Sequence, residues 1–174
     1  MPRQLRRIAP AAILAALVLP SLAHAREEKV ALDQIPTSVA ATVKQRFADA
    51  TLKGAGKETE KGRLVYEVTL DDKGRNVDVT LTPTGELLMI EKTIPTNELP
   101  APVASALNKK YAGATYRTVE EIVEVQGKAE KLAYYEVALV TPKHDSKEVR
   151  VTPDGAKVTE EDDEDEGENG EDDD

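Results

Sequence analysis

The chain contains one sequence pattern twice, and this internal repeat constrains the fold more than any other feature. Each copy has an apolar residue before a proline, then apolar residues at every fourth position, then a Y-E-V-x-L segment and a V-x-[L/V]-T-P-x-G segment. The principal matched positions are Ile35 and Leu99, Val39 and Val103, Val43 and Leu107, Phe47 and Tyr111, Tyr66 and Tyr135, and Gly85 and Gly155. The separation of matched positions grows from 64 to 70 residues, so we expect insertions in loops of the second copy.

The apolar residues four positions apart form one stripe of a helix. Each copy is therefore predicted to begin with a helix, within residues 35–47 and 99–111. Pro36 suits the first turn of such a helix, because the N–H that proline lacks has no helical partner there.

The rest of each copy alternates between apolar and polar residues, which is typical of strands. The predicted strands are residues 51–60, 64–70, 77–81 and 87–94 in the first copy, and residues 115–125, 132–140, 147–152 and 156–159 in the second. The segment Asp71 to Arg75 is predicted to be a hairpin turn. We expect an α+β fold of two tandem repeats, each a helix packed on an antiparallel sheet of three to four strands, because one face of the strands is polar. The two copies either pack side by side or join into one continuous sheet.

The repeated pattern resembles PepSY-like domains, and more closely the tandem β-lactamase-inhibitor-like group of periplasmic bacterial proteins. The residues that carry the resemblance are Leu99, Pro100, Val103, Leu107, Tyr111, Ala114, Tyr135, Glu136, Val137, Val149, Val151, Pro153, Asp154 and Gly155. The first copy has Ile35, Phe47 and Thr84 where that pattern has Leu, Tyr and Asp. The resemblance covers about residues 32–160, and it implies a helix on an antiparallel sheet, twice, outside the cytoplasm.

The same resemblance implies binding rather than catalysis, since such modules regulate or inhibit secreted peptidases or act as envelope sensors. The β-lactamase inhibitors hold their enzyme on the exposed face of the sheet. This chain has no cysteine, and its predicted polar face is not rich in aromatic residues. The resemblance therefore does not support β-lactamase as the target.

The first 25 residues are predicted to be a cleavable secretory signal peptide. Arg3, Arg6 and Arg7 precede an apolar segment, and residues 23–25 are Ala-His-Ala, a small-x-small cleavage site. The apolar segment is too short to span a membrane, and no other part of the chain approaches the length that a span needs. The predicted organisation is a signal peptide at 1–25, PepSY-like repeats at 26–94 and 95–159, and a disordered acidic tail at 160–174. We therefore expect a periplasmic or secreted protein.

The net charge of −10 comes mainly from the tail. Residues 160–174 contain twelve acidic residues and no basic one, so this segment is not expected to fold. The repeats are close to neutral and show no basic stripe, which argues against binding of nucleic acid. The tail either keeps the protein soluble, binds divalent cations such as calcium weakly, or attracts a basic partner.

Candidate catalytic groups are few. The run His144-Asp145-Ser146 contains the residue types of a hydrolase triad, but three consecutive residues cannot converge on one reacting atom. Glu67 and Glu136 occupy matched positions, and paired catalytic carboxylates would need a cleft that the sequence does not indicate. We expect no enzyme activity, no cofactor and no metal site in the repeats.

We therefore expect a non-enzymatic binding or regulatory module that contacts another envelope or secreted protein, such as a peptidase, through the polar face of its sheet. The candidate contact residues, taken from strand alternation, are Val65, Glu67, Thr69, Asp78, Thr80, Thr82 and Arg150. The alternative is an envelope protein that responds to divalent cations through its acidic tail.

Overall fold

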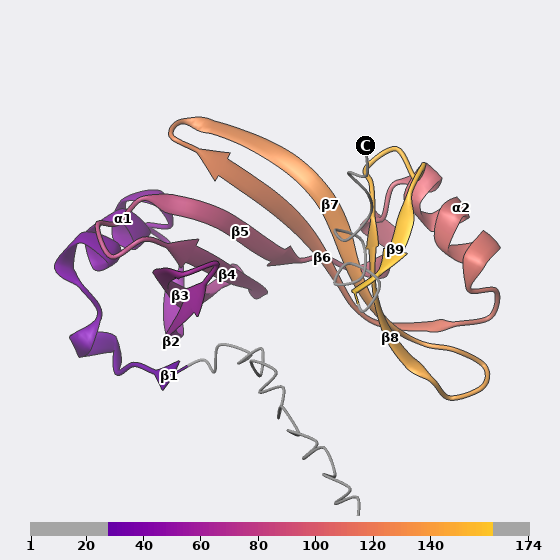
Figure 1. Ribbon diagram of the computed structural model, residues 1–174, viewed down its shortest axis with the longest axis horizontal. Helices are drawn as coiled ribbons and strands as arrows, with labels where there is room; N and C mark the ends of the chain where they lie inside the picture. The colour runs from indigo at the N-terminus through magenta and orange to yellow at the C-terminus, as the bar shows by residue number, and fades with distance from the viewer. Residues whose placement is uncertain (1–27, 162–174) are drawn as a thin grey trace, which may run out of the picture.

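The strands form a single antiparallel sheet in which each strand pairs with the next one in the chain (Figure 1). This architecture comes from a computed structural model that describes residues 28–161. The strands are β1 (Glu28–Lys29), β2 (Thr51–Glu60), β3 (Arg63–Asp72), β4 (Arg75–Leu81), β5 (Leu87–Thr93), β6 (Thr115–Gln126), β7 (Ala129–Val140), β8 (Ser146–Val151) and β9 (Val158–Glu160). Two α-helices, α1 (Thr37–Arg46) and α2 (Ala101–Lys110), follow the short 3₁₀ turns η1 (Leu32–Gln34) and η2 (Thr96–Glu98).

The predicted fold class is wrong: the protein has a mainly-β fold built on one nine-stranded sheet, not two repeats of a helix on its own sheet. The finding that overturns the prediction is the pairing of β5 with β6, which runs from Met89 opposite Glu124 to Thr93 opposite Glu120. Separate sheets would leave the backbone groups of both strands unpaired along two edges. Joining the sheets satisfies these groups, and the connection between the two strands contains η2 and α2.

The two helices pack on one face of this sheet, at its two ends (Figure 1). Helix α1 buries Val39 and Val43 in a core that it shares with β3 and β4. Helix α2 buries Val103 and Leu107 in a second core. The strand residues fully buried in these cores are Val68, Leu70, Val77, Val79 and Leu81 in the first, and Val137, Leu139, Val149 and Val151 in the second. Since side chains alternate along a strand, the intervening residues point to the opposite face, which we call the open face.

Each helix is held against the sheet by a turn that ends in glycine. The turn after β4 reaches α1, where the Thr42 hydroxyl donates to the Gly85 carbonyl at 2.7 Å. Gly85 has φ +83°, and a Cβ atom there would lie 2.6 Å from the Ser38 carbonyl oxygen. Gly155 makes the same kind of approach to α2, with a Cβ position 2.4 Å from the Pro102 oxygen. Only glycine fits these positions, because both the backbone angle and the close approach exclude a side chain.

Three side-chain contacts reinforce the junction between the two halves of the sheet. The Arg75 guanidinium donates to both oxygens of Glu98, at 2.9 and 2.8 Å. The Thr93 hydroxyl donates to Glu120 at 3.0 Å across the β5–β6 pairing. Arg46, at the end of α1, pairs with Glu130 near the tip of the β6–β7 hairpin. These contacts help to fix the orientation of one end of the sheet relative to the other.

The predicted strand at residues 51–60 is confirmed as β2, although the segment contains two glycines. At the other end of the sheet, Glu160 belongs to β9 and not to a tail. The predicted signal peptide and residues 162–174 of the predicted tail lie outside the described residues.

Neither α-helix of residues 28–161 is long and apolar enough to cross a membrane.

Candidate functional site: the open face of the sheet

Within residues 28–161 no helix covers the open face, and its central part is a row of carboxylates that crosses several strands. Asp78 on β4 lies opposite Glu91 on β5, and Glu120 on β6 lies opposite Glu136 on β7. Glu67 on β3 lies one strand further out, opposite Thr80. Like charges directly opposite each other on neighbouring strands destabilise a sheet. The row therefore costs stability, which makes it a candidate for function.

The carboxyl group of Glu91 lies at the centre of the row. Burial, as the largest cause, and the charges of Glu136, Glu67, Glu120 and Asp78 together raise its pKa to about 7. Burial also raises the pKa of Glu120, while the hydrogen bond from Thr93 opposes this shift. The centre of the face therefore holds a carboxyl group whose charge changes near neutral pH.

Arg150 on β8 is the basic residue that borders this row. Its Nε donates to Glu136 at 3.1 Å, and its Nη2 donates to Glu161 at 2.9 Å. The guanidinium also lies 5.0 Å from the centre of the Tyr134 ring, a cation–π contact. Burial and hydrogen bonds with Glu136 and Glu161 raise the pKa of nearby Glu148. One arginine thus balances only part of the negative charge at this end of the row.

Apolar side chains form the floor beneath the carboxylates. Ile122 lies between Glu91 and Tyr134 on the neighbouring strands and is 1 % exposed. Val65 on β3 is 2 % exposed. The low polarity of this floor strengthens the electrostatic effect of the carboxylates above it.

The structure brings five of the seven sequence-predicted contact residues together. Val65, Glu67, Thr69, Asp78 and Thr80 lie together on the open face of β3 and β4. Val65 and Thr80 are buried there, Thr80 to 4 % exposure, and so form the floor rather than a contact surface.

The other two predicted residues lie apart from that group. Thr82 follows β4, and its hydroxyl accepts the Glu86 N–H at 3.1 Å within the turn. Arg150 lies four strands away from β4, beside Glu136.

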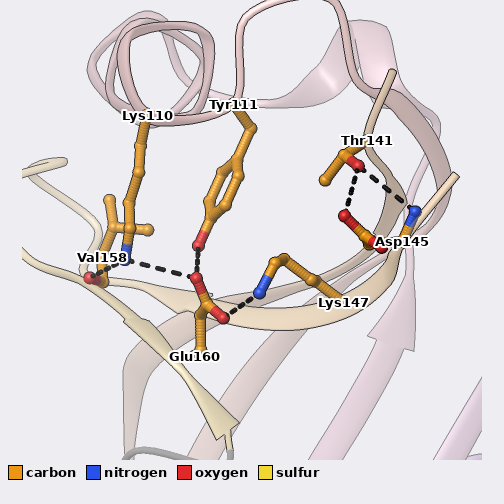
Figure 2. Close-up of polar contacts among 7 residues, drawn as sticks. All are labelled: Lys110, Tyr111, Thr141, Asp145, Lys147, Val158 and Glu160. Carbon is orange, nitrogen blue, oxygen red and sulfur yellow. Dashed lines mark hydrogen bonds and ion pairs between the residues drawn. The ribbon is translucent and has the colours of Figure 1, made fainter. Parts of the chain in front are cut away.

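The edge strand β9 is fixed on the helix-bearing side of the sheet by a polar cluster centred on Glu160 (Figure 2). The Tyr111 hydroxyl donates to Glu160 at 2.8 Å, and Lys147 forms an ion pair with the same carboxylate. Lys110 approaches Glu160 at 3.9 Å and donates to the Val158 carbonyl. These bonds, with Lys147 and Tyr111 contributing most, hold the pKa of Glu160 below its ordinary value. The cluster joins β9 to the end of α2 and leads the next residue, Glu161, to Arg150.

The catalytic candidates from the sequence lie on different elements. Glu67 and Glu136 lie on β3 and β7, with three strands between them, and so do not face each other. His144 and Asp145 belong to a turn in which the Asp145 N–H donates to the Thr141 hydroxyl at 3.3 Å. Among residues 28–161, no group of three or more acidic, His or Cys side chains is placed to hold a metal ion.

Sequence reasoning missed Glu91, Glu120 and Tyr134. Their strands were predicted, but which strands pair across the middle of the sheet was not. Glu91 and Glu120 come together only because β5 pairs with β6. A search for acidic residues at alternating positions in residues 87–94 and 115–125 could have found them as candidates.

The sequence matches no protein-family model and no curated protein. The fold resembles those of several solved structures. One is a BLIP-like protein from Bacteroides fragilis, with a TM-score of 0.55 and 16 % identity over 78 % of this chain and 92 % of that one. Another is a proposed periplasmic protein from Bacteroides eggerthii, with a TM-score of 0.57 and 18 % identity over 72 % and 88 % of the two chains.

A third similar structure is a DUF2874 family protein from Bacteroides uniformis. Its TM-score is 0.56, with 16 % identity over 72 % of this chain and 88 % of that one. At these identities the likeness concerns the fold. It agrees with the resemblance to β-lactamase-inhibitor-like periplasmic proteins, whereas it gives no support to the PepSY-like part of that resemblance. The periplasmic assignment of the protein from B. eggerthii agrees with the location that residues 1–25 predict.

Proposed function

We propose that this protein is a non-enzymatic binding module of the periplasm, exported by residues 1–25, whose open face binds a basic surface of another envelope protein. The observation that carries the proposal is the carboxylate row from Asp78 and Glu91 to Glu120 and Glu136. Like charges that destabilise the free protein become favourable when a partner supplies the opposite charge.

The chemistry of the face suits a protein partner rather than a small molecule. The row runs across four strands above an apolar floor, and the face around it carries no helix. Protein interfaces combine an apolar centre with charged groups that set orientation and association rate. A BLIP-like protein among the similar structures supports the same type of role. Binding would block or modulate the partner, and a peptidase is the class that we favour.

The proposal is tested with the double variant Glu91→Gln/Glu120→Gln, which removes two charges and keeps the size of the side chains. The matched control is Asp49→Asn/Glu86→Gln, which removes two charges from exposed positions away from the open face. Each mature protein is used to capture partners from native envelope extract, and the affinity for the purified partner is then measured.

We expect the open-face variant to bind the captured partner at least about tenfold more weakly than the wild type, because two close charge pairs are lost. The control should bind like the wild type. Equal loss in both variants would contradict a specific role for the open face, and so would a captured partner that lacks a basic surface.

A further inference from the structure

A hollow lies at the β2 end of the open face, beside the free edge of that strand. Its volume is about 480 Å³. Gly54 and Ala55 form its floor, Val30 and Leu32 form an apolar wall, and Lys29 and Lys53 lie at its rim. The hollow differs from the carboxylate row in the sign of its charge, because its charged groups are basic.

Gly54 leaves the floor of the hollow without a side chain. Its φ is not in the left-handed region, and a Cβ atom added to it would lie 3.9 Å from Thr69 Cβ, an ordinary contact. Glycine destabilises a strand interior, and neither the backbone angle nor the packing requires it here. Bare backbone within a strand often marks a place where a ligand or another chain approaches closely.

A β-bulge beside Gly54 directs a lysine to the same hollow. The pairing of β2 with β3 shifts register between Leu52 and Gly54, so Lys53 is the extra residue. Bulges redirect side chains and occur often at sheet edges and functional sites. Lys53 remains 53 % exposed although its Nζ lies 3.5 Å from Asp71. Lys29 is also exposed, and no acidic side chain within residues 28–161 forms an ion pair with it.

The edge of β2 beside the hollow has no strand partner. Strand β1 pairs only with Gly56 and Lys57, and the Val30 N–H adds one bond to the Ala55 carbonyl at 2.9 Å. Within the described residues, Thr51 to Gly54 therefore have no strand neighbour on that side. An unpaired edge is a template for an added strand, as in proteins that bind extended peptides by β-augmentation.

Leu32 supplies apolar surface next to this edge. It is 40 % exposed, and Leu64 is the one other large hydrophobic residue of residues 28–161 that is exposed to a similar degree. An exposed apolar residue beside a hollow with a bare floor suits an apolar side chain of a ligand.

We propose that this hollow binds a short, extended, acidic peptide segment that adds to the edge of β2 at Thr51–Gly54. An apolar side chain of the peptide lies over Gly54 against Leu32, and carboxylates on either side of it pair with Lys29 and Lys53. The proposal goes beyond the function proposed for the carboxylate row, since it concerns another part of the sheet and a ligand of opposite charge.

The test uses fluorescein-labelled pentapeptides of sequence Asp-Val-X-Val-Asp, where X is Val, Leu or Phe, and matched peptides with Lys in place of Asp. Binding to the mature protein is measured by fluorescence anisotropy, and the site is located by amide NMR shifts. We expect saturable binding of at least one acidic peptide, with shifts at Thr51–Gly54, Lys29 and Leu32. The lysine peptides should not bind.

The decisive variant is Gly54→Val, which fills the hollow with a residue that favours strands. Its melting temperature should equal or exceed that of the wild type, while peptide affinity falls by about tenfold or more because the added side chain occupies the ligand position. The matched control is Thr59→Val, an exposed position of the same strand outside the hollow, which should bind like the wild type.

The proposal would be overturned by the absence of saturable binding by every acidic peptide, by equal binding of the lysine peptides, by unchanged affinity in Gly54→Val, or by shifts confined to other strands. A dimeric wild type that becomes monomeric in Gly54→Val would show that a second copy occupies this edge, which also contradicts the proposal.

Discussion

Glu91 on β5 lies directly opposite Asp78 on β4, on the open face of the sheet. Two carboxylates in this position repel each other, and Glu120 and Glu136 repeat the arrangement on β6 and β7. The sheet thus concentrates negative charge at its centre, while burial and these neighbours raise the pKa of Glu91 to about 7.

The raised pKa of Glu91 predicts that the protein becomes less stable as the pH rises from about 4.5 to about 7. The folded state binds the proton of Glu91 more tightly than the unfolded state does, so the free energy of unfolding falls across this window and is constant above it. Glu91→Gln removes the contribution of Glu91 and leaves those of Glu120 and Glu148, whose pKa values are also raised. We expect a melting temperature about 2–5 °C above that of the wild type at pH 8, and little difference at pH 4.5, because the partial exposure of the group limits the gain.

Circular dichroism melts at the two pH values check this prediction, with Glu86→Gln as the control. A stabilisation of the same size at both pH values would show that the gain does not come from the charge of Glu91.

The turn glycines predict a separate effect on stability. Gly85→Ala should destabilise the protein by about 3 kcal/mol or more, because it adds both a left-handed backbone penalty and a clash with the Ser38 carbonyl. Gly74 has the same φ of +83° with no atom within 4 Å of an added Cβ. Gly74→Ala should therefore cost only about 1 kcal/mol, the conformational part alone. Urea unfolding measures both values, and equal costs would contradict the close approach at Gly85.

The polar cluster around Glu160 predicts how the edge strand β9 is held. Tyr111→Phe removes the hydroxyl that donates to Glu160 at 2.8 Å, and should cost about 0.5–1.5 kcal/mol. Amide hydrogen exchange should speed up at Arg150 and Thr152, whose N–H groups face β9, more than at the buried β3 positions. A uniform change of exchange over the whole sheet would mean that the cluster does not hold β9 locally.

The sequence predicted the individual elements better than their assembly. The four-residue spacing from Val39 to Val43 located α1, because the helix residues that contact the core recur every three to four positions in the sequence. The join between β5 and β6 was left open, because pairing between distant strands depends on backbone groups that every residue carries. The predicted fold class was wrong because the sequence did not show that β5 pairs with β6.

The candidate site was predicted only in part, because it too depends on which strands pair. Alternation placed Glu67 and Asp78 on the open face, yet it gave no sign that Thr80 between them would be buried. Glu91 and Glu120 became neighbours only through the register of β5 and β6. The hollow at Gly54 depends on a β-bulge and an incomplete strand β1, which no local pattern records.

The most direct test of the central claim is the salt dependence of partner binding. The affinity of the mature protein for its captured envelope partner is measured over a range of salt concentrations, for the wild type and for Glu91→Gln/Glu120→Gln. If the carboxylate row binds a basic surface, the wild-type affinity falls steeply with salt, and the variant binds more weakly with a shallower dependence. An affinity that does not change with salt, or the same dependence in both proteins, would contradict the claim.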